Sequence, residues 1–366
     1  MSKVLILDTD YNRIKHDIEK VFQEFKYDFK GKKVFVKPNL LGSFAPDKGV
    51  TTHPAVVSSV VDYLISHGAS VVVGDNCGMP RAYGDNESVA KVTGIYEASK
   101  GHYINIGKSA AQVKTGIPGY PEAAVARAVL ECDYFISLPK FKTHLNTIIT
   151  AGIKNSYGLL VGSEKTKLHS MFPEYKKFAK AVVEVFKIRP PDLVIMDAIV
   201  GMQGDGPNSS DLRNINKVIA SNDTVAVDAI ICYMMGADPA KVDTMRLARE
   251  ENLGQADIKK MQIIGNLERL SNFKLPSTYN KEAQGESLPA KLILNMVRKV
   301  KLKVSSKKCI SCKQCYEICP VKAIDFDKYP RINARKCIAC FCCKEVCPVQ
   351  AISIGGILGL LQKIIR

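Results

Sequence analysis

Residues 309–324 read CISCKQCYEICPVKAI, and residues 337–352 read CIACFCCKEVCPVQAI. Each segment places four cysteines in the spacing C-x2-C-x2-C-x3-C, followed directly by proline. The two copies are offset by 28 residues and are identical at 10 of 16 positions. The last sixth of the chain is therefore a repeat built around eight cysteines.

This repeat resembles the two-cluster bacterial ferredoxins. The resemblance implies two [4Fe–4S] clusters, and the fourth cysteine of each run ligates the cluster of the other run. The ligands of one cluster would be Cys309, Cys312, Cys315 and Cys347, and those of the other Cys337, Cys340, Cys343 and Cys319. Cys342 is surplus and is expected to be a buried thiol, because exchanging it with Cys343 would spoil the spacing.

Two other uses of paired cysteines fit this spacing less well. A structural zinc site also uses CxxC pairs, but two complete CxxCxxCxxxCP runs are typical of iron–sulfur ligation. A disulfide framework is disfavoured, since adjacent CxxC thiols in a reducing compartment rarely form structural disulfide bonds. The sequence does not indicate whether a flavin or another organic cofactor accompanies the clusters.

The chain has 366 residues, of which 46% are apolar and 24% charged, which predicts two globular units. A strand-like segment begins at Val4, leaving no room for a signal peptide. No segment reaches the ~18–20 uninterrupted apolar residues that a membrane span needs. Because cluster-bearing thiols must stay reduced and no export signal is present, we expect a cytoplasmic protein from an organism or compartment low in oxygen.

The formal net charge is +16, and two oxidised clusters with their thiolates would lower it to about +12. Residues 300–351 alone hold 11 Lys or Arg against 4 Asp or Glu, a balance of +7. Such a field suits a membrane surface, an acidic redox partner such as a ferredoxin or flavodoxin, or an anionic small molecule. Nucleic acid is disfavoured because no recognised binding motif accompanies the charge.

Short β-branched runs alternate with amphipathic helical patterns up to about residue 268. The expected strands are Lys3–Leu7, Lys33–Lys37, Ser70–Gly74, Tyr134–Leu138, Asp192–Asp197, Lys217–Ala220 and Met261–Ile264. The expected helices are Asn12–Lys26, Pro54–His67, Glu87–Ser99, Glu122–Leu130, Glu174–Phe186, Thr224–Met235 and Pro239–Glu251. Strands without polar alternation are buried on both faces, so the pattern predicts a layered α/β domain with a mostly parallel sheet.

Four segments are expected along the chain. Residues 1–268 would form the α/β domain, and residues 269–304 a polar linker that ends in a basic amphipathic helix, Leu288–Val304. Residues 305–354 would form the small α+β ferredoxin-type domain. Residues 355–366 are short, apolar and basic, which favours a C-terminal helix packed against the rest of the protein.

Polar residues collect where the predicted strands end, which is where open α/β sheets bind ligands. The candidate binding residues are Lys37, Asn39, Thr52, His53, Asp75, Lys140, Lys154, Asn155, Gly201, Gly204 and Gly206. Burying several lysines costs several kcal/mol unless an anion compensates them, so we expect an anionic ligand. Lys37 and Lys140 should matter most, and His144 and Lys142 are the candidate catalytic residues, with His144 as general acid.

Local structure offers a second interpretation of some of these residues. Thr52 is placed to cap a helix that has Pro54 in its first turn, and turn chemistry alone can explain Asp75. The glycines from 201 to 206 would either let the backbone approach a ligand or form a flexible loop. No GxGxxG or GxxxxGK[ST] motif occurs in the required strand–helix context, which disfavours a dinucleotide or P-loop site.

Taken together, the segments KPN (37–39), TTHP (51–54), PKFKTH (139–144), KN (154–155) and GMQGDGP (201–207) resemble the domain of unknown function 362 family. The resemblance covers about residues 30–235. Members of this family are often fused to ferredoxin modules. The resemblance implies an N-terminal domain with an unassigned site, and it supplies no reaction.

Two functions remain at this point. In the first, an oxidoreductase passes single electrons from the ferredoxin module to an anionic substrate or a bound cofactor at the strand ends. In the second, the chain is an electron-transfer or maturation protein without turnover, whose α/β domain docks a client. Polar residues at several strand ends favour the enzyme, while the missing cofactor fingerprint favours the carrier.

Overall fold

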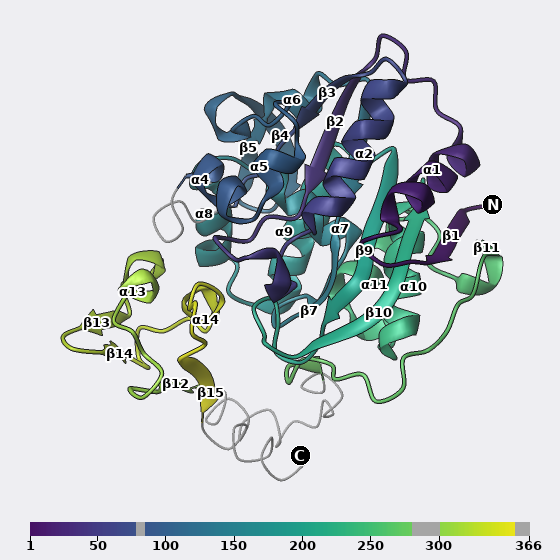
Figure 1. The fold of residues 1–366 in the computed structure, drawn as a ribbon. Coiled ribbons are helices and arrows are strands. Elements are labelled where there is room, and N and C mark those ends of the chain that lie inside the picture. The colour runs from purple at the N-terminus through teal and green to yellow at the C-terminus, as the bar shows by residue number, and fades with distance from the viewer. Residues whose placement is uncertain (78–84, 280–300, 356–366) are drawn as a thin grey trace.

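The computed structural model describes residues 1–77, 85–279 and 301–355, which form a large α/β body and a small cysteine-rich module beside it (Figure 1). The strands of the body are β1 (Lys3–Asp8), β2 (Lys33–Pro38), β3 (Ser70–Val73), β4 (Ala110–Ile117), β5 (Tyr120–Ala126), β6 (Tyr134–Leu138), β7 (Lys140–His144), β8 (Ile148–Thr150), β9 (Leu193–Met202), β10 (Leu212–Ser221) and β11 (Gln262–Ile264). Its helices are α1 (Ile14–Phe25), α2 (Pro54–Ser66), α4 (Asn86–Val92), α5 (Ile95–Ala98), α6 (Arg127–Leu130), α7 (Gly152–Asn155), α8 (Glu164–Met171), α9 (Tyr175–Ile188), α10 (Thr224–Met235) and α11 (Asp243–Glu250). Short 3₁₀ turns lie at Pro46–Lys48, Ile106–Lys108, Ser156–Leu159, Pro239–Lys241 and Ile258–Lys260.

The main sheet of the described residues has nine strands. Seven follow the order β11-β1-β10-β9-β6-β2-β3, and β7 pairs with both β9 and β8. Five of the eight strand pairs are parallel, while β1–β10, β9–β10 and β7–β8 are antiparallel. The predicted layered, mostly parallel α/β class is confirmed.

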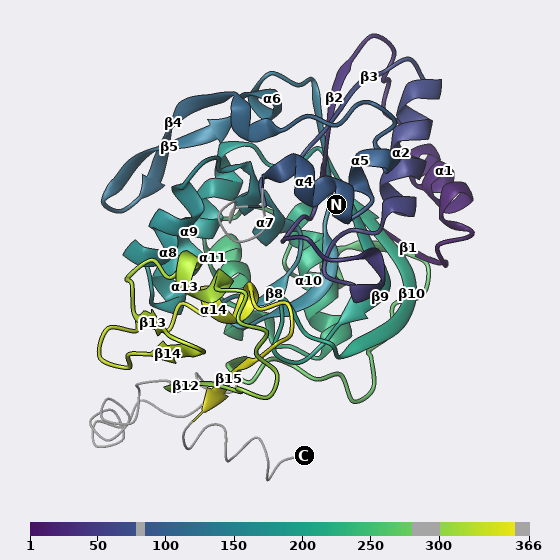
Figure 2. The same ribbon diagram turned by 60° about the vertical axis from the view of Figure 1, so that its left-hand side comes forward.

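Both faces of this sheet are apolar because successive side chains of a strand point to opposite sides. In β2, Phe35 lies in one apolar core, whereas Val34 and Val36 lie in the other. Helices α1 and α2 cover the face of Val34, and α9, α10 and α11 supply the core on the opposite face (Figures 1 and 2). The strand ends near the module thus stand on a rigid, doubly covered sheet.

Three helix predictions need correction. The segment Glu122–Leu130 is helical only from Arg127, because Tyr120–Ala126 is a strand that pairs antiparallel with β4. Its alanines favour a helix, but the hairpin turn at Gly119, with φ of 73°, returns the chain along β4 instead. The predicted helix Glu87–Ser99 is split by Gly94, and Pro239–Glu251 begins with a 3₁₀ turn before α11.

Two strand predictions were too short, and four strands of the body, β4, β5, β7 and β8, were missed. Strands β9 and β10 extend past the predicted limits as a long antiparallel pair. The segment after β6, expected as a strand exit, is itself strand β7, which pairs with β9. A polar strand escapes an apolar-run search, since KFKTH has charged residues at alternate positions.

The module contains β12 (Lys301–Val304), α13 (Gln314–Ile318), β13 (Ile324–Phe326), β14 (Pro330–Ile332), α14 (Cys342–Glu345) and β15 (Ile352–Gly355). β12 pairs antiparallel with β15, so the predicted helix Leu288–Val304 is wrong over its last four residues. Residues 288–300 of that prediction, and nearly all of the predicted C-terminal helix 355–366, lie outside the described residues. Among the helices of the described ranges, none is long and apolar enough to cross a membrane.

Candidate functional site

The eight repeated cysteines line two separate cavities in the module. One cavity, with about 320 Å³ of empty space that is partly open to solvent, is lined by Cys309, Cys312, Cys315 and Cys347. The other, with about 310 Å³ that is also partly open to solvent, is lined by Cys319, Cys337, Cys340 and Cys343. We call these the outer and the inner cavity. Each one contains three cysteines of one run and the fourth cysteine of the other.

These two donor sets fit the groups that the resemblance implies. Four thiolates that converge on one cavity are the ligands of a [4Fe–4S] cluster, and the sharing of the fourth cysteine is the pattern of two-cluster ferredoxins. Over the described residues, no group of three or more His, Cys, Asp or Glu side chains is placed to hold a single metal ion. Ligation of two [4Fe–4S] clusters by these eight cysteines therefore remains a prediction. The arrangement of the two donor sets is compatible with it.

A third space lies between the body and the module. This cleft measures about 640 Å³, part of it open to solvent. Strand ends and helices of the body supply most of its walls, and Cys342 and Glu345 of α14 supply the remainder. Cys343, the neighbour of Cys342, lines the inner cavity. The cleft and the inner cavity are thus separated by little more than the backbone of α14.

Polar contacts from the body fix α14 in this position. Asn208 Nδ2 donates to the carbonyl oxygens of Glu345 and Cys347 at 3.2 and 3.1 Å. Asn146 Nδ2 donates to the carbonyl oxygen of Cys340 at 3.2 Å, and Lys344 Nζ donates to Asp205 O at 2.9 Å. The loops after β7 and β9 therefore hold the backbone of the cysteine-rich segment directly.

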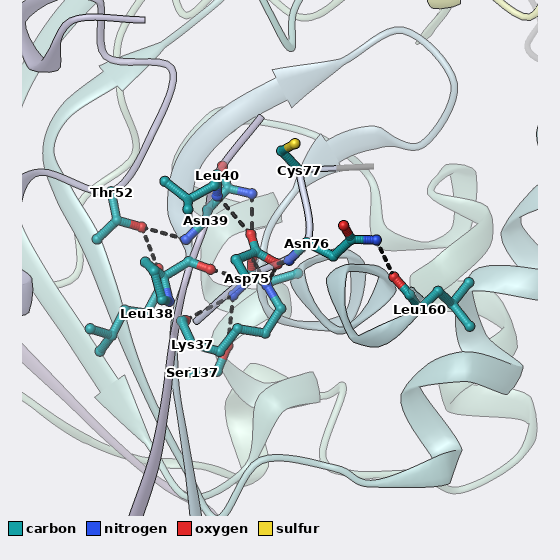
Figure 3. Close-up of polar contacts among 12 residues, drawn as sticks. Lys37, Asn39, Leu40, Thr52, Asp75, Asn76, Cys77, Ser137, Leu138 and Leu160 are labelled. Carbon is teal, nitrogen blue, oxygen red and sulfur yellow. Dashed lines mark hydrogen bonds and ion pairs between the residues drawn. The ribbon is translucent and has the colours of Figure 1, made fainter. Parts of the chain in front are cut away.

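Lys37, at the end of β2, is completely buried and forms an ion pair. Its Nζ lies 2.7 Å from Asp75 Oδ1, and the Asp75 carboxylate also accepts the backbone N–H groups of Leu40 and Asn76 (Figure 3). Gly158 packs against both charged groups, and a Cβ at that position would overlap Asp75 Oδ1. Burial lowers the pKa of Lys37 to about 8 although Asp75 opposes the shift. This lysine lines the cleft but already has a counterion.

Lys140, at the start of β7, is compensated in the same way. Its Nζ lies 2.7 Å from Asp197 Oδ2 and donates to the Tyr11 hydroxyl at 2.9 Å. Tyr11 stacks on His53 with a ring separation of 3.6 Å, and the backbone N–H of His53 donates to Asp197. Within the described residues, the cleft lining does not include Lys140. The prediction that Lys37 and Lys140 need an external anion is therefore wrong, because each has a carboxylate partner.

Lys142 and Lys154 differ, since no carboxylate of the described residues lies within 4.0 Å of either ammonium group. Lys142 Nζ donates to Asn39 Oδ1 and to Val50 O, both at 2.6 Å. Lys154 Nζ lies 4.6 Å from the centre of the Tyr157 ring, a cation–π contact. Both lysines line the cleft.

Burial sets the ionisation of these two lysines. It lowers the pKa of Lys142 to about 7, and the neighbouring charges of Lys154 and Lys140 push in the same direction. It lowers the pKa of Lys154 to about 8 against the opposing effect of Glu345. Both groups therefore exchange protons near neutral pH, which an ordinary lysine does not.

His144, at the end of β7, is buried and accepts hydrogen bonds at Nδ1. The backbone N–H groups of Asn146 and Thr147 donate to this atom at 3.0 and 3.4 Å, while Nε2 lies 3.7 Å from Glu345 Oε1. Burial, followed by the charge of Lys154, holds the pKa of His144 well below its usual range. A neutral imidazole is a poor proton donor, so the structure does not support His144 as general acid; Lys142 is better placed.

The other predicted residues have structural contacts. Thr52 Oγ1 accepts from the backbone N–H of Asn39 and donates to Leu138 O, while the N-cap of α2 is His53, which corrects the assignment of Thr52 as N-cap. Gly201 packs against Phe141 and Ile215 within β9.

Two other glycines and one asparagine complete the predicted set. Gly206 packs against the backbone of Thr143, and Gly204 has a left-handed backbone with φ of 74°. Thus the glycines approach protein atoms, and only Pro207 of that loop lines the cleft. Asn155 does line the cleft, and its side chain links Lys37, Asn39 and Ser137.

Several cleft residues were missed from the sequence. They are Leu40, Leu41, Cys77, Thr150, Tyr157, Lys165, Thr166, His169, Cys342 and Glu345. Thr150 Oγ1 is buried without a hydrogen-bond partner among the described residues. Glu345 had a usable signal, because it lies two residues after Cys343. The remainder come from helices and loops whose approach to the cleft depends on tertiary packing.

The fold and these sites define an α/β protein that carries a ferredoxin-type module. The chain belongs to the family described as domain of unknown function DUF362, whose model matches residues 34–233, more than half of its length. Residues 308–351 match a 4Fe-4S dicluster domain, which shows the iron–sulfur character of the module. The recognition made from the sequence is confirmed.

The similar proteins include one relative by sequence and two solved structures. A thylakoid-associated protein of Synechocystis sp. is 30% identical over 226 residues, 61% of this chain and 68% of that protein. The lactate racemase apoprotein from Thermoanaerobacterium thermosaccharolyticum matches 64% of this chain and 57% of its own, with a TM-score of 0.40 and 10% identity. A Thermotoga maritima protein matches 59% and 56%, with a TM-score of 0.37 and 14% identity. This chain spans little more than half the length of those two solved chains.

Proposed function

We propose that this protein is an oxidoreductase whose module delivers single electrons to an anionic substrate in the cleft. One observation carries the proposal: the cleft and the inner cavity share α14, with Cys342 and Glu345 facing one and Cys343 facing the other. A cavity next to a ferredoxin-type redox site is where a substrate can receive electrons. The 4Fe-4S dicluster match supports the electron-transfer half of the proposal.

The lysines without carboxylate partners support the anionic character of the substrate. Lys142, which is buried, and Lys154, which is half-buried, place two cations at the cleft, and removing a charge from water is costly unless an opposite charge approaches it. Asn39 and Thr150 are positioned to add hydrogen bonds, with Leu40 and Tyr157 as apolar walls. A carboxylate or a phosphate group satisfies this combination.

Reduction of a carbon–carbon or carbon–oxygen double bond needs protons as well as electrons. The clusters, when bound in the two cavities, supply one-electron reducing equivalents. Lys142 lines the cleft with its pKa near 7, so its ammonium group can donate a proton and recover it from solvent. Asn39 and Val50 hold the Lys142 ammonium group in place through its other hydrogen bonds.

The test uses full-length protein, reconstituted and reduced without oxygen and then freed of reductant. Small monocarboxylates, dicarboxylates and phosphate esters are added one at a time, and reoxidation is followed by visible absorbance. We expect one class to reoxidise the protein. If no anion does so, while an added redox protein reoxidises it readily, the chain is an electron relay rather than an oxidoreductase.

A further inference from the structure

The outer and inner cavities differ in their access to solvent. All twelve cysteines lie in the described part of the chain, and only Cys312, at the outer cavity, is exposed. Ile310 beside it is 61% exposed, and Tyr316 on the following helix is 47% exposed. The inner cavity lies against the body through Phe341, which is completely buried against Leu145, while Cys319, Cys337 and Cys340 are half-buried. The outer cavity therefore has the one exposed cysteine of the described residues, while the inner cavity lies beside the body and the cleft.

Basic side chains surround the exposed edge of the outer cavity. Lys307, Lys308 and Lys313 are exposed in the loop that carries Cys309 and Cys312. Ser311 Oγ donates to Lys328 O at 2.9 Å, which brings the β13–β14 turn and its exposed Lys328 beside the same loop. The acidic residues nearby are the exposed Asp325 and Asp327 on that turn and Glu317 on α13. The loop itself, residues 305–313, has three lysines and no acid.

An apolar centre with a charged rim is suited to a brief protein–protein encounter. Electron-transfer complexes are small and short-lived, and complementary charge raises their association rates. Ile310 and Tyr316 form the apolar centre, and the lysines form the positive rim. Electron transfer weakens steeply with distance, so a carrier gains most by docking where a cysteine ligand reaches the surface.

We propose that this face docks a small acidic one-electron carrier protein, so that electrons arrive at the outer cavity and leave from the inner cavity into the cleft. Each encounter oxidises the carrier by one electron and reduces the module by one. No bond or proton is transferred in this step. The two cavities thus have different tasks, receiving and delivering, although their sequences are repeats of each other.

The experiment compares two charge-reversal variants of the full-length, reconstituted protein. One replaces Lys307→Glu, Lys308→Glu and Lys313→Glu at the proposed face. The control replaces Lys259→Glu and Lys260→Glu, which are exposed on the body. The probe is a reduced flavodoxin with an acidic surface, and both its binding and the rate of electron transfer are measured over a range of salt concentrations.

We expect the first variant to lose at least about tenfold in rate at low ionic strength and most of its salt dependence. Its affinity for the flavodoxin should fall in parallel, while the control stays within about twofold of the unmodified protein. Iron content and reduction by dithionite verify that both proteins carry intact clusters. Equal losses in the two variants, or no loss in the first, would overturn the proposal whatever the cleft binds.

Discussion

Four lysines lie near the strand ends of this protein, Lys37, Lys140 and Lys142 buried and Lys154, on α7, half-buried. Among the described residues, only Lys37 and Lys140 have a carboxylate within 4.0 Å. Lys37 and Lys140 each lie 2.7 Å from a buried aspartate oxygen. Lys142 and Lys154 line the same region, and their polar contacts within the described residues are a carbonyl, an amide oxygen and aromatic rings. All four have their pKa lowered by burial. A carboxylate within 4.0 Å therefore distinguishes Lys37 and Lys140, whereas the more distant Glu345 raises the pKa of both Lys142 and Lys154.

This difference indicates which lysines belong to the fold and which to the site. A buried ion pair holds two strand ends together, and removing one partner leaves a charge that the interior cannot solvate. A buried cation without a nearby carboxylate destabilises the folded protein in the absence of ligand. An anion that binds beside it offsets this unfavourable free energy. Substitutions at these lysines should therefore affect either stability or anion binding.

Lys140→Met should destabilise the protein by about 3–5 kcal/mol, because it leaves Asp197 buried without its cation. The free energy of unfolding, from denaturant titration of the full chain, measures this. Asp47→Asn is the control, since Asp47 is exposed and its ion pair is with the exposed neighbour Lys48. A loss below about 1 kcal/mol for Lys140→Met would contradict the assignment of the Lys140–Asp197 ion pair to the stability of the fold.

Lys142→Met should weaken binding of the anion at least about tenfold, with a smaller stability change of at most about 1–2 kcal/mol. The substitution removes a buried charge but leaves Asn39 and Val50 without their donor. Isothermal titration with the best anion of the panel measures the affinity. If Lys142→Met instead shifts the cluster potential and leaves anion binding intact, the lysine balances the charge of the cluster.

Anion binding should weaken as pH rises through the range from about 7 to about 9. Lys142 and Lys154 have pKa values of about 7 and about 8, so each is protonated below its value and neutral above it. The charged groups that face Lys142 are Lys154, Lys140, Glu345 and Asp75. Titrations at several pH values should show Lys142→Met losing the earlier part of the decline. A flat profile in the unmodified protein would contradict the assignment.

Thr150→Val should reduce anion affinity by about threefold to tenfold, the effect of one hydrogen bond. The Thr150 hydroxyl is buried, lines the cleft and has no partner within the described residues. Thr51→Val is the matched control. The Thr51 hydroxyl is also buried and has no hydrogen-bond partner among the described residues, but Thr51 does not line the cleft. Equal affinities for the two variants would remove Thr150 from the site.

The sequence predicted the architecture well because its strongest signals are local. Unbroken β-branched runs predict buried strands, and the spacing of the eight cysteines groups them into the two sets that line the two cavities. The long helices α1, α2, α9 and α10 were also predicted nearly to their ends. The β4–β5 hairpin was missed because its alanines favour a helix and only cross-strand pairing decides otherwise.

The site was predicted less completely because charge pairing is a tertiary property. Lys37 and Asp75 are 38 residues apart, and Lys140 and Asp197 are 57 apart, so no spacing rule connects them. The contribution of Glu345 depends on how the module docks, which Asn146 and Asn208 determine through backbone carbonyl groups. The polar residues at the predicted strand ends indicated the region of the site. They did not indicate which lysines have a carboxylate within 4.0 Å and which do not.

Electrons should pass from the module to an anion held by Lys142 in the cleft. Rapid mixing of reduced, full-length protein with the best anion tests this transfer by counting the electrons lost per molecule of product formed. We expect two electrons per reduced bond, a rate at least about tenfold lower in Lys142→Met, and an unchanged rate in the exposed control Lys259→Met. Reoxidation without a reduced product, or at the same rate in all three proteins, would contradict it.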